Sequence, residues 1–260
     1  MDLNGKRLIL TGASSGIGLA LLELLLESGV KVAASSRTME KTAIDHPLLL
    51  KINCDVSSRD SLDNLFKYSL EQLGGIDLFI ANAGFAYYEK QPAPDWEKSE
   101  RIFATNVLGH IYCAQKMKAI NGDAPYNFVC TASAMSYLSI PGYALYSSTK
   151  AAIRGFADAY RFELGKNQHF QVAFPVATDT NFFQAAGSNP PVPWPTQSPE
   201  SVARSIIKGI TSNRQEIFPS RLFRAIMIFD RFLPIIFPLY RLDANRNFQS
   251  WLQKQRENGS

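Results

Sequence analysis

Short apolar runs alternate along the chain with longer segments in which apolar residues recur at a helical period. A buried strand gives a short continuous apolar run, whereas a helix packed on one side repeats every ~3.6 residues. Helices are predicted over residues 19–26, 59–73, 95–119, from Tyr146 to about Gly165, and from Pro199 onward with Ser198 as N-cap. Strands are predicted at Lys6–Leu10, Val30–Ser35, Leu48–Ile52, Ile76–Ala81, Tyr126–Thr131, Gln171–Phe174 and Gln215–Phe218. This alternation indicates one α/β domain, doubly wound around a mostly parallel sheet.

Residues 182–198 interrupt the alternation. They contain four prolines and Trp194 and show little regular periodicity. Long irregular segments in compact domains often serve as binding loops or lids. We expect this segment to lie over the carboxyl ends of the strands, where the aromatic-rich residues 85–96 would help to shape an apolar pocket.

Residues 219–257 exceed what a core of about residues 6–218 needs and predict an apolar, helical C-terminal extension. Between its arginines, Asp230 is the only acid. The arginines are Arg221, Arg224, Arg231 and Arg241. The extension either covers the substrate cavity or packs in a homodimer interface, or its residues 219–242 lie in a membrane surface with the arginines at anionic headgroups. Both interpretations favour a lipophilic substrate.

Composition supports a globular domain and narrows its surroundings. Of 260 residues, 46% are hydrophobic and 19% charged, and the net charge of +4 is too mild to indicate nucleic acid. Cys54, Cys113 and Cys130 lie outside any metal-ligand spacing, so we expect free thiols and no metal site. We find no secretory signal pattern, and the apolar run from Phe232 to Tyr240 is too short to span a bilayer. A cytoplasmic location is expected, with membrane association as the open alternative.

A glycine-rich turn, TGASSGIG over residues 11–18, joins the first predicted strand to the first predicted helix. Strand, turn and helix in this order present backbone N–H groups and a positive helix end to a diphosphate. The spacing is GxxxGxG rather than the commoner GxGxxG, so the inference depends on the flanking strand and helix. The residues predicted to bind phosphate are Gly12, Ser14, Ser15, Gly16, Ile17 and Gly18.

The residues after the second strand indicate which dinucleotide is bound. An NAD site uses an acidic residue ~20 positions after the glycines to bind the ribose 2′-hydroxyl. Here the run is Ser36-Arg37-Thr38, with no acid between Lys31 and Met39. An arginine with neighbouring hydroxyls would bind a 2′-phosphate. We therefore predict a preference for NADP(H), with NAD(H) not excluded.

Further polar residues follow the next strands. Asp55 could accept a hydrogen bond from an adenine amino group or could cap the following helix. The glycine of Asn82-Ala83-Gly84 suggests backbone close to a ligand, although an ordinary turn also explains it. Asn106 lies within an apolar helical stretch, where a buried asparagine needs partners or a role.

Tyr146 and Lys150 are four positions apart on a predicted helix and therefore share one face. A cation beside a phenol favours the phenolate and moves the tyrosine pKa from about 10 towards neutrality. Ser133, thirteen residues before the tyrosine, could donate a hydrogen bond to the same substrate oxygen. Alone, a YxxxK pair is most often a solvated helix face, and only its companions give it weight.

In kind and order, these motifs resemble the short-chain dehydrogenase/reductase family. The matching residues are TGASSGIG at 11–18, CDV at 54–56, NAG at 82–84, Asn106, Ser133, YSSTK at 146–150 and a proline-led turn from Pro175 to Thr180. The resemblance covers about residues 6–218 and implies a Rossmann domain with a seven-stranded parallel sheet. It also implies hydride transfer between a nicotinamide and a carbonyl or alcohol substrate, and homodimers or homotetramers built through the long helices.

The resemblance implies roles for individual residues. Tyr146 would be the general acid or base, with Lys150 lowering its pKa and binding the nicotinamide ribose. Ser133 would polarise the substrate oxygen, and Asn106 would hold a water linked to Lys150. The remaining cofactor contacts would be Asp55, Val56, Asn82, Ala83, Gly84, Pro175 and Thr180. The chain departs from the family at Val176, where a glycine is usual.

Two alternatives remain open at this stage. One is an NAD-dependent alcohol dehydrogenase working in the oxidative direction, which Arg37 disfavours. The other is a non-catalytic dinucleotide sensor or scaffold on the same fold, which the complete set of Asn106, Ser133, Tyr146 and Lys150 disfavours.

Overall fold

A computed structural model of the chain describes residues 2–258. Its centre is a seven-stranded sheet in the order β3-β2-β1-β4-β5-β6-β9, in which every pairing is parallel. The strands are β1 (Arg7–Thr11), β2 (Lys31–Ser36), β3 (Leu49–Asn53), β4 (Leu78–Ala81), β5 (Tyr126–Thr131), β6 (Gln168–Ala173) and β9 (Glu216–Ile217). The predicted α/β class with a seven-stranded parallel sheet is confirmed.

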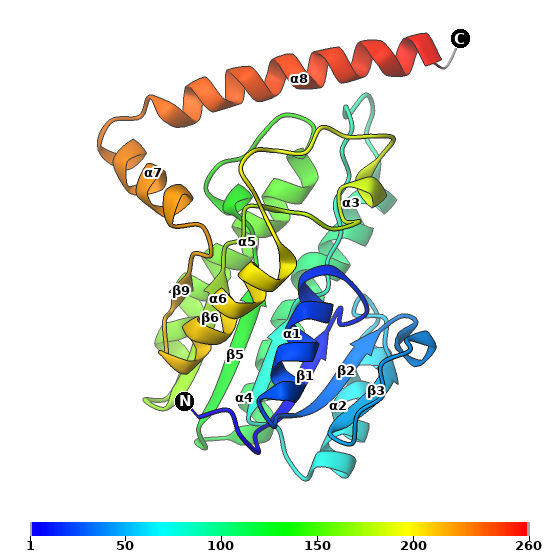
Figure 1. The fold of residues 1–260 in the computed structure, drawn as a ribbon, viewed down its shortest axis with the longest axis vertical. Helices are drawn as coiled ribbons and strands as arrows, with labels where there is room; N and C mark the ends of the chain where they lie inside the picture. The colour runs from blue at the N-terminus through cyan, green and yellow to red at the C-terminus, as the bar shows by residue number, and fades with distance from the viewer. Residues whose placement is uncertain (1, 259–260) are drawn as a thin grey trace.

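Helices cover both faces of the sheet (Figure 1). The helices α1 (Gly16–Glu27) and α6 (Pro199–Thr211) pack on one face. On the other face lie α2 (Arg59–Leu73), α4 (Gly109–Asn121) and α5 (Ala144–Tyr160). Each strand contributes side chains to both layers, because alternate side chains point to opposite faces of the sheet.

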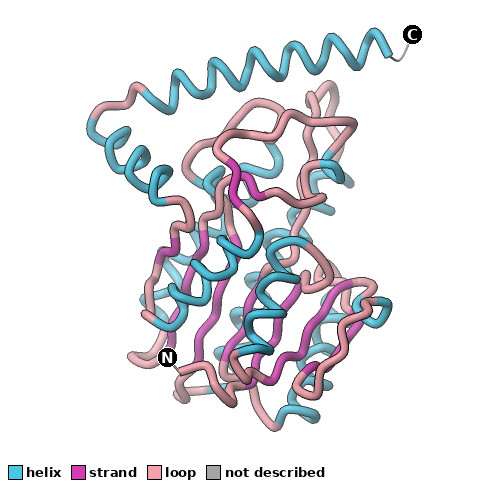
Figure 2. The backbone as a smooth tube through the Cα atoms, in the orientation of Figure 1, coloured by secondary structure: helices cyan, strands magenta, loops and turns pink. Residues whose placement is uncertain are grey.

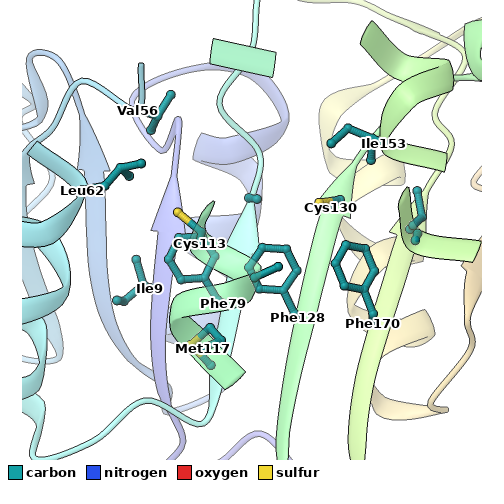
Figure 3. Packing of buried hydrophobic residues seen from close by; sticks show 14 of the residues in the cluster. Ile9, Val56, Leu62, Phe79, Cys113, Met117, Phe128, Cys130, Ile153 and Phe170 are labelled. Atoms are coloured by element: carbon teal, nitrogen blue, oxygen red, sulfur yellow. The ribbon is translucent and has the colours of Figure 1, made fainter. Parts of the chain in front are cut away.

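Stacked phenylalanines fill the layer beneath α4 and α5 (Figure 3). Phe79 of β4 lies between Phe66 and Phe128, with ring centroids 5.3 and 5.2 Å away. Cys113 and Met117 of α4 pack onto the same rings. This rigid layer supports the carboxyl ends of β4 and β5, where parallel sheets bind their ligands.

The predicted helix over residues 95–119 is interrupted by a wider turn. It consists of α3 (Trp96–Phe103), a π-helical turn (Ala104–Leu108) and α4. Such turns are rare and often occur at functional sites, and this one contains Asn106.

Three predicted boundaries were wrong by three residues or more, the first being the start of α1, which is Gly16 and not Leu19. Strand β6 begins at Gln168, three residues before the predicted start, because Gln168 and Gln171 are buried although polar. Gln171 donates to the carbonyl oxygens of Gly209 and Arg214, at 3.1 and 2.8 Å. Helix α5 ends at Tyr160, and a 3-10 turn over Arg161–Glu163 follows it.

The loop over residues 182–198 is tied at both ends by a small parallel pairing that the sequence pattern did not predict. Here β7 (Ala177–Thr178) pairs with β8 (Thr196–Gln197), so the loop leaves and returns at one place (Figure 2). After it, Ser198 caps α6 by accepting from the Ser201 N–H at 3.2 Å, as predicted.

The C-terminal extension forms α7 (Arg221–Phe232) and α8 (Ile236–Asn258), which lie at the end of the molecule beyond the carboxyl ends of the strands (Figure 1). Rings of Phe248 and Trp251 on α8 lie 5.4 and 4.9 Å from Tyr88. The Trp251 Nε1–H also donates to the Ser188 carbonyl at 2.8 Å. The extension is therefore held against the loop 182–198 and the segment around Tyr88.

Candidate active site

One cavity of about 1040 Å³ opens at the carboxyl ends of the strands. Its walls contain most of the residues predicted from the motifs: Gly12, Ser14, Ser15, Gly16, Ile17, Ser36, Arg37, Thr38, Asp55, Val56, Asn82, Ala83, Gly84, Ser133, Tyr146, Lys150, Pro175 and Thr180. Of the predicted site residues, only Gly18 and Asn106 do not line it. Both lie directly behind the lining.

The glycine-rich turn has the geometry of a phosphate cradle. Gly12 and Gly16 have φ of +68° and +55°, a conformation that favours glycine. Ser15 is the N-cap of α1 but makes no side-chain cap hydrogen bond, and the first turn contains no acid. The N–H groups of that turn and the positive helix end are thus available to an anion. These residues fit the diphosphate of a dinucleotide.

Gly18 serves packing behind this cradle. A Cβ there would overlap the Gly12 carbonyl oxygen and lie 2.7 Å from Nδ2 of Asn82. Thr11, which the sequence analysis did not single out, ties the two strand ends together. Its Oγ1 accepts from the backbone N–H groups of Asn82 and Ala83, at 3.1 and 3.2 Å.

The far end of the cavity is polar and contains Arg37. Arg37 lies close enough to Asp55 to lower the pKa of that carboxyl, although hydrogen bonds from Ser57 are the main cause. Ser57 donates to the Asp55 carboxylate from its N–H at 2.9 Å and its hydroxyl at 2.7 Å. The helix-cap interpretation of Asp55 is wrong, because Ser58 caps α2.

Asn106 is completely buried, and its amide group is used in three hydrogen bonds. Its Oδ1 accepts from the Phe85 N–H at 3.1 Å, and its Nδ2 donates to the Phe85 carbonyl at 2.8 Å. Nδ2 also lies 3.2 Å from Oγ1 of Thr149 on α5. Asn106 thus joins the π-helical turn to the segment after β4 and to the helix that carries Tyr146.

Tyr146, Ser133 and Lys150 converge at the middle of the cavity, and all three are buried. Lys150 Nζ donates to the Thr131 carbonyl at 2.9 Å and lies 5.5 Å from the centre of the Tyr146 ring. Ser133 Oγ accepts from the Met135 N–H at 3.1 Å, which leaves its own proton for another acceptor. This places two hydroxyls and an amine where polar and apolar cavity walls meet.

The pKa of Tyr146 differs from the sequence-based expectation. Burial raises it, and the hydrogen bond with Ser133 only partly offsets that rise. Burial also lowers the pKa of Lys150, to about 8, so the lysine holds its proton less firmly than an exposed lysine does. Both shifts have one cause: a dry site disfavours the charged form of either group.

This lowered lysine pKa predicts a pH dependence of stability. Between pH about 8 and 10.5 the unfolded chain keeps a proton that folded Lys150 has lost. Stability from this group therefore rises with pH across that window. We expect the melting temperature of the cofactor-free protein, minus that of Lys150→Met, to increase from pH 7.5 to pH 10. Buried thiols and tyrosines change stability with pH in the opposite direction, and subtracting the melting temperature of the variant cancels their contribution. A difference in melting temperature that stays constant with pH would contradict the lowered pKa of Lys150.

His110, which the motifs did not flag, lies one turn after Asn106 and is also buried. Its Nε2 is 2.9 Å from the Ala83 carbonyl oxygen, and Nδ1 is 3.7 Å from Sγ of Cys130. Burial lowers its pKa to about 3, so it is neutral and donates to Ala83. The i, i+4 spacing from Asn106 was the available signal.

The apolar half of the cavity is built partly by the C-terminal extension. Its contributing residues are Leu222, Phe223, Ile226, Ile236, Phe237 and Tyr240. The rings of Phe223 and Phe237 stack at 6.2 Å, which joins α7 to α8. The interpretation that the extension covers the cavity is confirmed.

Three further observations complete the site. Val176 lines the cavity with negative φ, so a β-branched residue is accommodated there. Among residues 2–258, no group of three or more histidine, cysteine, aspartate or glutamate side chains could hold a metal ion. Within the same residues, every helix is too short or too polar to cross a membrane.

Comparison with known proteins identifies relatives across most of the chain. The short chain dehydrogenase family model matches residues 6–190. The chain is 30% identical over 229 residues to the 3-ketodihydrosphingosine reductase of Bos taurus, covering 80% of this chain and 69% of that protein. It is 23% identical over 256 residues to the 11-beta-hydroxysteroid dehydrogenase 1A of Arabidopsis thaliana, covering 90% and 73%.

Solved structures show the same fold. A short chain dehydrogenase/reductase from Burkholderia phymatum in complex with NAD superposes with a TM-score of 0.78 at 19% identity, covering 90% of this chain and 96% of that one. A short chain dehydrogenase from Burkholderia cenocepacia in complex with NADP gives 0.77 at 21% identity, covering 89% and 94%. The chain therefore belongs to the short-chain dehydrogenase/reductase family and is an oxidoreductase that acts on CH–OH or carbonyl groups with NAD(P).

Proposed function

We propose that this protein is an NADP(H)-dependent reductase of a lipophilic ketone, with Tyr146 as the general acid. The observation that supports this most is the convergence of Ser133, Tyr146 and Lys150 between the polar and apolar halves of one cavity. A panel of ketones, aldehydes and alcohols, assayed by nicotinamide absorbance, tests it. Turnover of long-chain ketones above small or phosphorylated ones is the expected result.

The chain's own residues supply proton transfer and orientation. A bound nicotinamide dinucleotide would supply or accept the hydride at the substrate carbon. Tyr146 donates its phenolic proton to the substrate oxygen, so a carbonyl gains one hydride and one proton. Ser133 donates a hydrogen bond to the same oxygen and stabilises its developing charge. The raised pKa keeps Tyr146 protonated at neutral pH, as reduction requires.

Lys150 and Asn106 act behind the tyrosine. We assign Lys150 two roles, binding the nicotinamide ribose and returning a proton to Tyr146. Gly84 lies beside both polar groups, since a Cβ there would be 3.2 Å from Oδ1 of Asn106 and 3.5 Å from Nζ of Lys150. We propose that a water shared by these two atoms links the lysine to solvent.

The substrate class rests on the cavity and on the relatives. The apolar half of the cavity is lined by side chains of α7, of α8 and of the loop 182–198, which we call the lid. Phe182, Phe183 and Trp194 are the aromatic residues that the lid contributes. A relative at 30% identity is named 3-ketodihydrosphingosine reductase. A long-chain lipid with a ketone near one end fits both facts.

Cofactor preference is tested at Arg37, which lines the polar end of the cavity beside Ser36 and Thr38. We expect Arg37→Ala to raise the KM for NADPH roughly tenfold or more and to change that for NADH little. The reason is loss of a charge-assisted contact to the 2′-phosphate, worth about 1.5–3 kcal/mol. Initial rates with both cofactors measure it. An NADH preference of the unaltered enzyme would instead favour the NAD-dependent alcohol dehydrogenase.

Assembly and compartment are further proposals. We propose a homodimer or homotetramer through the α4 and α5 faces, where Leu108 is 59% exposed just before α4. We also propose a reducing, cytoplasmic environment, which suits the three buried free thiols of Cys54, Cys113 and Cys130.

A further inference from the structure

An exposed apolar patch covers the outer side of the C-terminal extension. We call it the outer patch, and it consists of Leu222, Ile228, Phe229, Phe232, Leu233, Ile235, Leu239 and Leu242. Its members are between 46% and 83% exposed. Large apolar side chains are usually scattered singly on a surface, whereas a contiguous group marks an interaction site.

The outer patch is continuous with the cavity. The opposite sides of α7 and α8 line the cavity through residues such as Phe223 and Phe237. Leu222 belongs to both surfaces, being half exposed and also in the cavity wall. The elbow between the helices is fixed, because the buried Asp230 carboxylate accepts from the Phe237 N–H at 2.9 Å. An apolar molecule leaving the patch would therefore meet apolar walls on its way inward.

Positive charge accompanies the patch. On α7, Arg221, Arg224 and Arg231 are all exposed and share one stripe beside the apolar one, at spacings of three and seven. The acid within this helix, Asp230, is turned inward. A two-fold interface made by this surface would gather the same positive charge from both copies without supplying acids to pair with it, which is unfavourable. An anionic lipid surface complements both the charge and the apolar stripe.

Aromatic residues border the patch on the lid. Trp194 is 69% exposed, and its carbonyl accepts from the Tyr240 hydroxyl at 2.8 Å. Tryptophan and tyrosine favour the boundary between lipid and water, because one part of each side chain is apolar and another polar. Lid and extension thus present one apolar, aromatic and cationic end of the molecule.

We propose that the outer patch lies in the surface of an anionic lipid bilayer and that the substrate enters the cavity directly from the lipid. The second half of this proposal rests on the proposed reduction of a lipophilic ketone. The first half concerns binding alone. The two helices lie in the interface and do not cross the bilayer, in keeping with their length and polarity.

Vesicle flotation tests the binding. The full chain is mixed with phosphatidylcholine vesicles that contain or lack phosphatidylserine, and the floating fraction is measured at low and high salt. We expect binding to the anionic vesicles that weakens with salt. The double variant Phe232→Ser/Leu239→Ser should bind at least tenfold more weakly, because it removes two large apolar side chains from the surface that would be buried in the lipid.

A matched control removes an exposed phenylalanine elsewhere. Phe162 is 92% exposed in the turn after α5, and Phe162→Ser should leave vesicle binding unchanged. Arg221→Gln/Arg231→Gln should weaken binding to anionic vesicles and not to neutral ones. Equal flotation of the Phe232/Leu239 variant and the unaltered protein would overturn the proposal. So would a dimer in sedimentation that this variant abolishes, which would assign the patch to a second copy.

Activity distinguishes this inference from the proposed function. With a long-chain ketone dissolved in vesicles, the Phe232→Ser/Leu239→Ser variant should turn over several-fold more slowly than the unaltered enzyme. With a small water-soluble ketone the two should be equal, since neither Phe232 nor Leu239 lines the cavity. Equal rates on both substrates would refute delivery from lipid. No turnover of any ketone by the unaltered enzyme would refute the proposed function and leave the flotation result standing.

Discussion

Replacing Tyr146 by phenylalanine should lower turnover by about a hundred- to ten-thousand-fold, the usual contribution of a positioned general acid. The ring would stay in place, because it packs against Phe182 at 5.5 Å and Tyr143 at 6.2 Å. The phenolic proton would be lost, and Ser133 alone would face the substrate oxygen. Steady-state rates on the best ketone measure the loss of turnover. We expect dinucleotide affinity to be nearly unchanged, and fluorescence titration measures it.

A neighbouring tyrosine provides the control. Tyr143, just before α5, is buried, and within residues 2–258 its hydroxyl finds no hydrogen-bond partner. Tyr143→Phe removes the same atom one helical turn away. It should keep turnover within about twofold, because Tyr143 is outside the cavity lining and its hydroxyl has no partner to lose within residues 2–258. If Tyr146→Phe retained more than a tenth of the activity, the proton would have to come from another group.

Replacing Gly18 by alanine should abolish dinucleotide binding and lower the free energy of unfolding by about 1–3 kcal/mol, the usual cost of overpacking. The added Cβ would overlap the Gly12 carbonyl and press on Asn82. Gly12 cannot retreat, since its own Cα faces Ala83 so closely that a Cβ there would be 2.8 Å from the Ala83 Cα. Chemical denaturation and dinucleotide titration measure the two effects.

Gly155 supplies the matched substitution. It lies in α5, and no atom of residues 2–258 beyond its own helix and chain neighbours would come within 4 Å of an added Cβ. Gly155→Ala should therefore stabilise the protein by about 0.5–1 kcal/mol, the helix preference of alanine over glycine, and leave binding unaltered. Wild-type dinucleotide affinity in Gly18→Ala would show that α1 can shift without loss of the cradle.

The sequence predicted the structure best where the local pattern of residues alone decides it. Buried parallel strands give apolar runs, so β1 to β5 were located to within a residue or two by pattern alone. The glycines of the phosphate turn were found because tight turns and close approach restrict residue type. Ser133, Tyr146 and Lys150 were found through their spacing, and the structure places them together in one cavity.

Prediction failed where tertiary contacts override local preference. The start of β6 was missed because Gln168 and Gln171 look like surface residues until distant carbonyls satisfy them. The π-helical turn at Asn106 leaves no hydrophobic signature, because its cause is the pairing with Phe85, 21 residues away. His110 was overlooked because its spacing from Asn106 does not reveal the Ala83 carbonyl that its ring contacts, 27 residues away in the chain.

By itself, the sequence predicted the fold class, the succession of strands along the chain, the phosphate turn and the tyrosine, serine and lysine that meet in the cavity. Each is encoded by periodicity or by residue type at fixed spacing along the chain. Only the tertiary structure decided the direction of the Tyr146 pKa shift and the placement of the C-terminal extension. Both depend on burial, which is set by segments remote in sequence. Helices α7 and α8 close a cavity whose proposed catalytic groups come from α5 and from the segment just after β5.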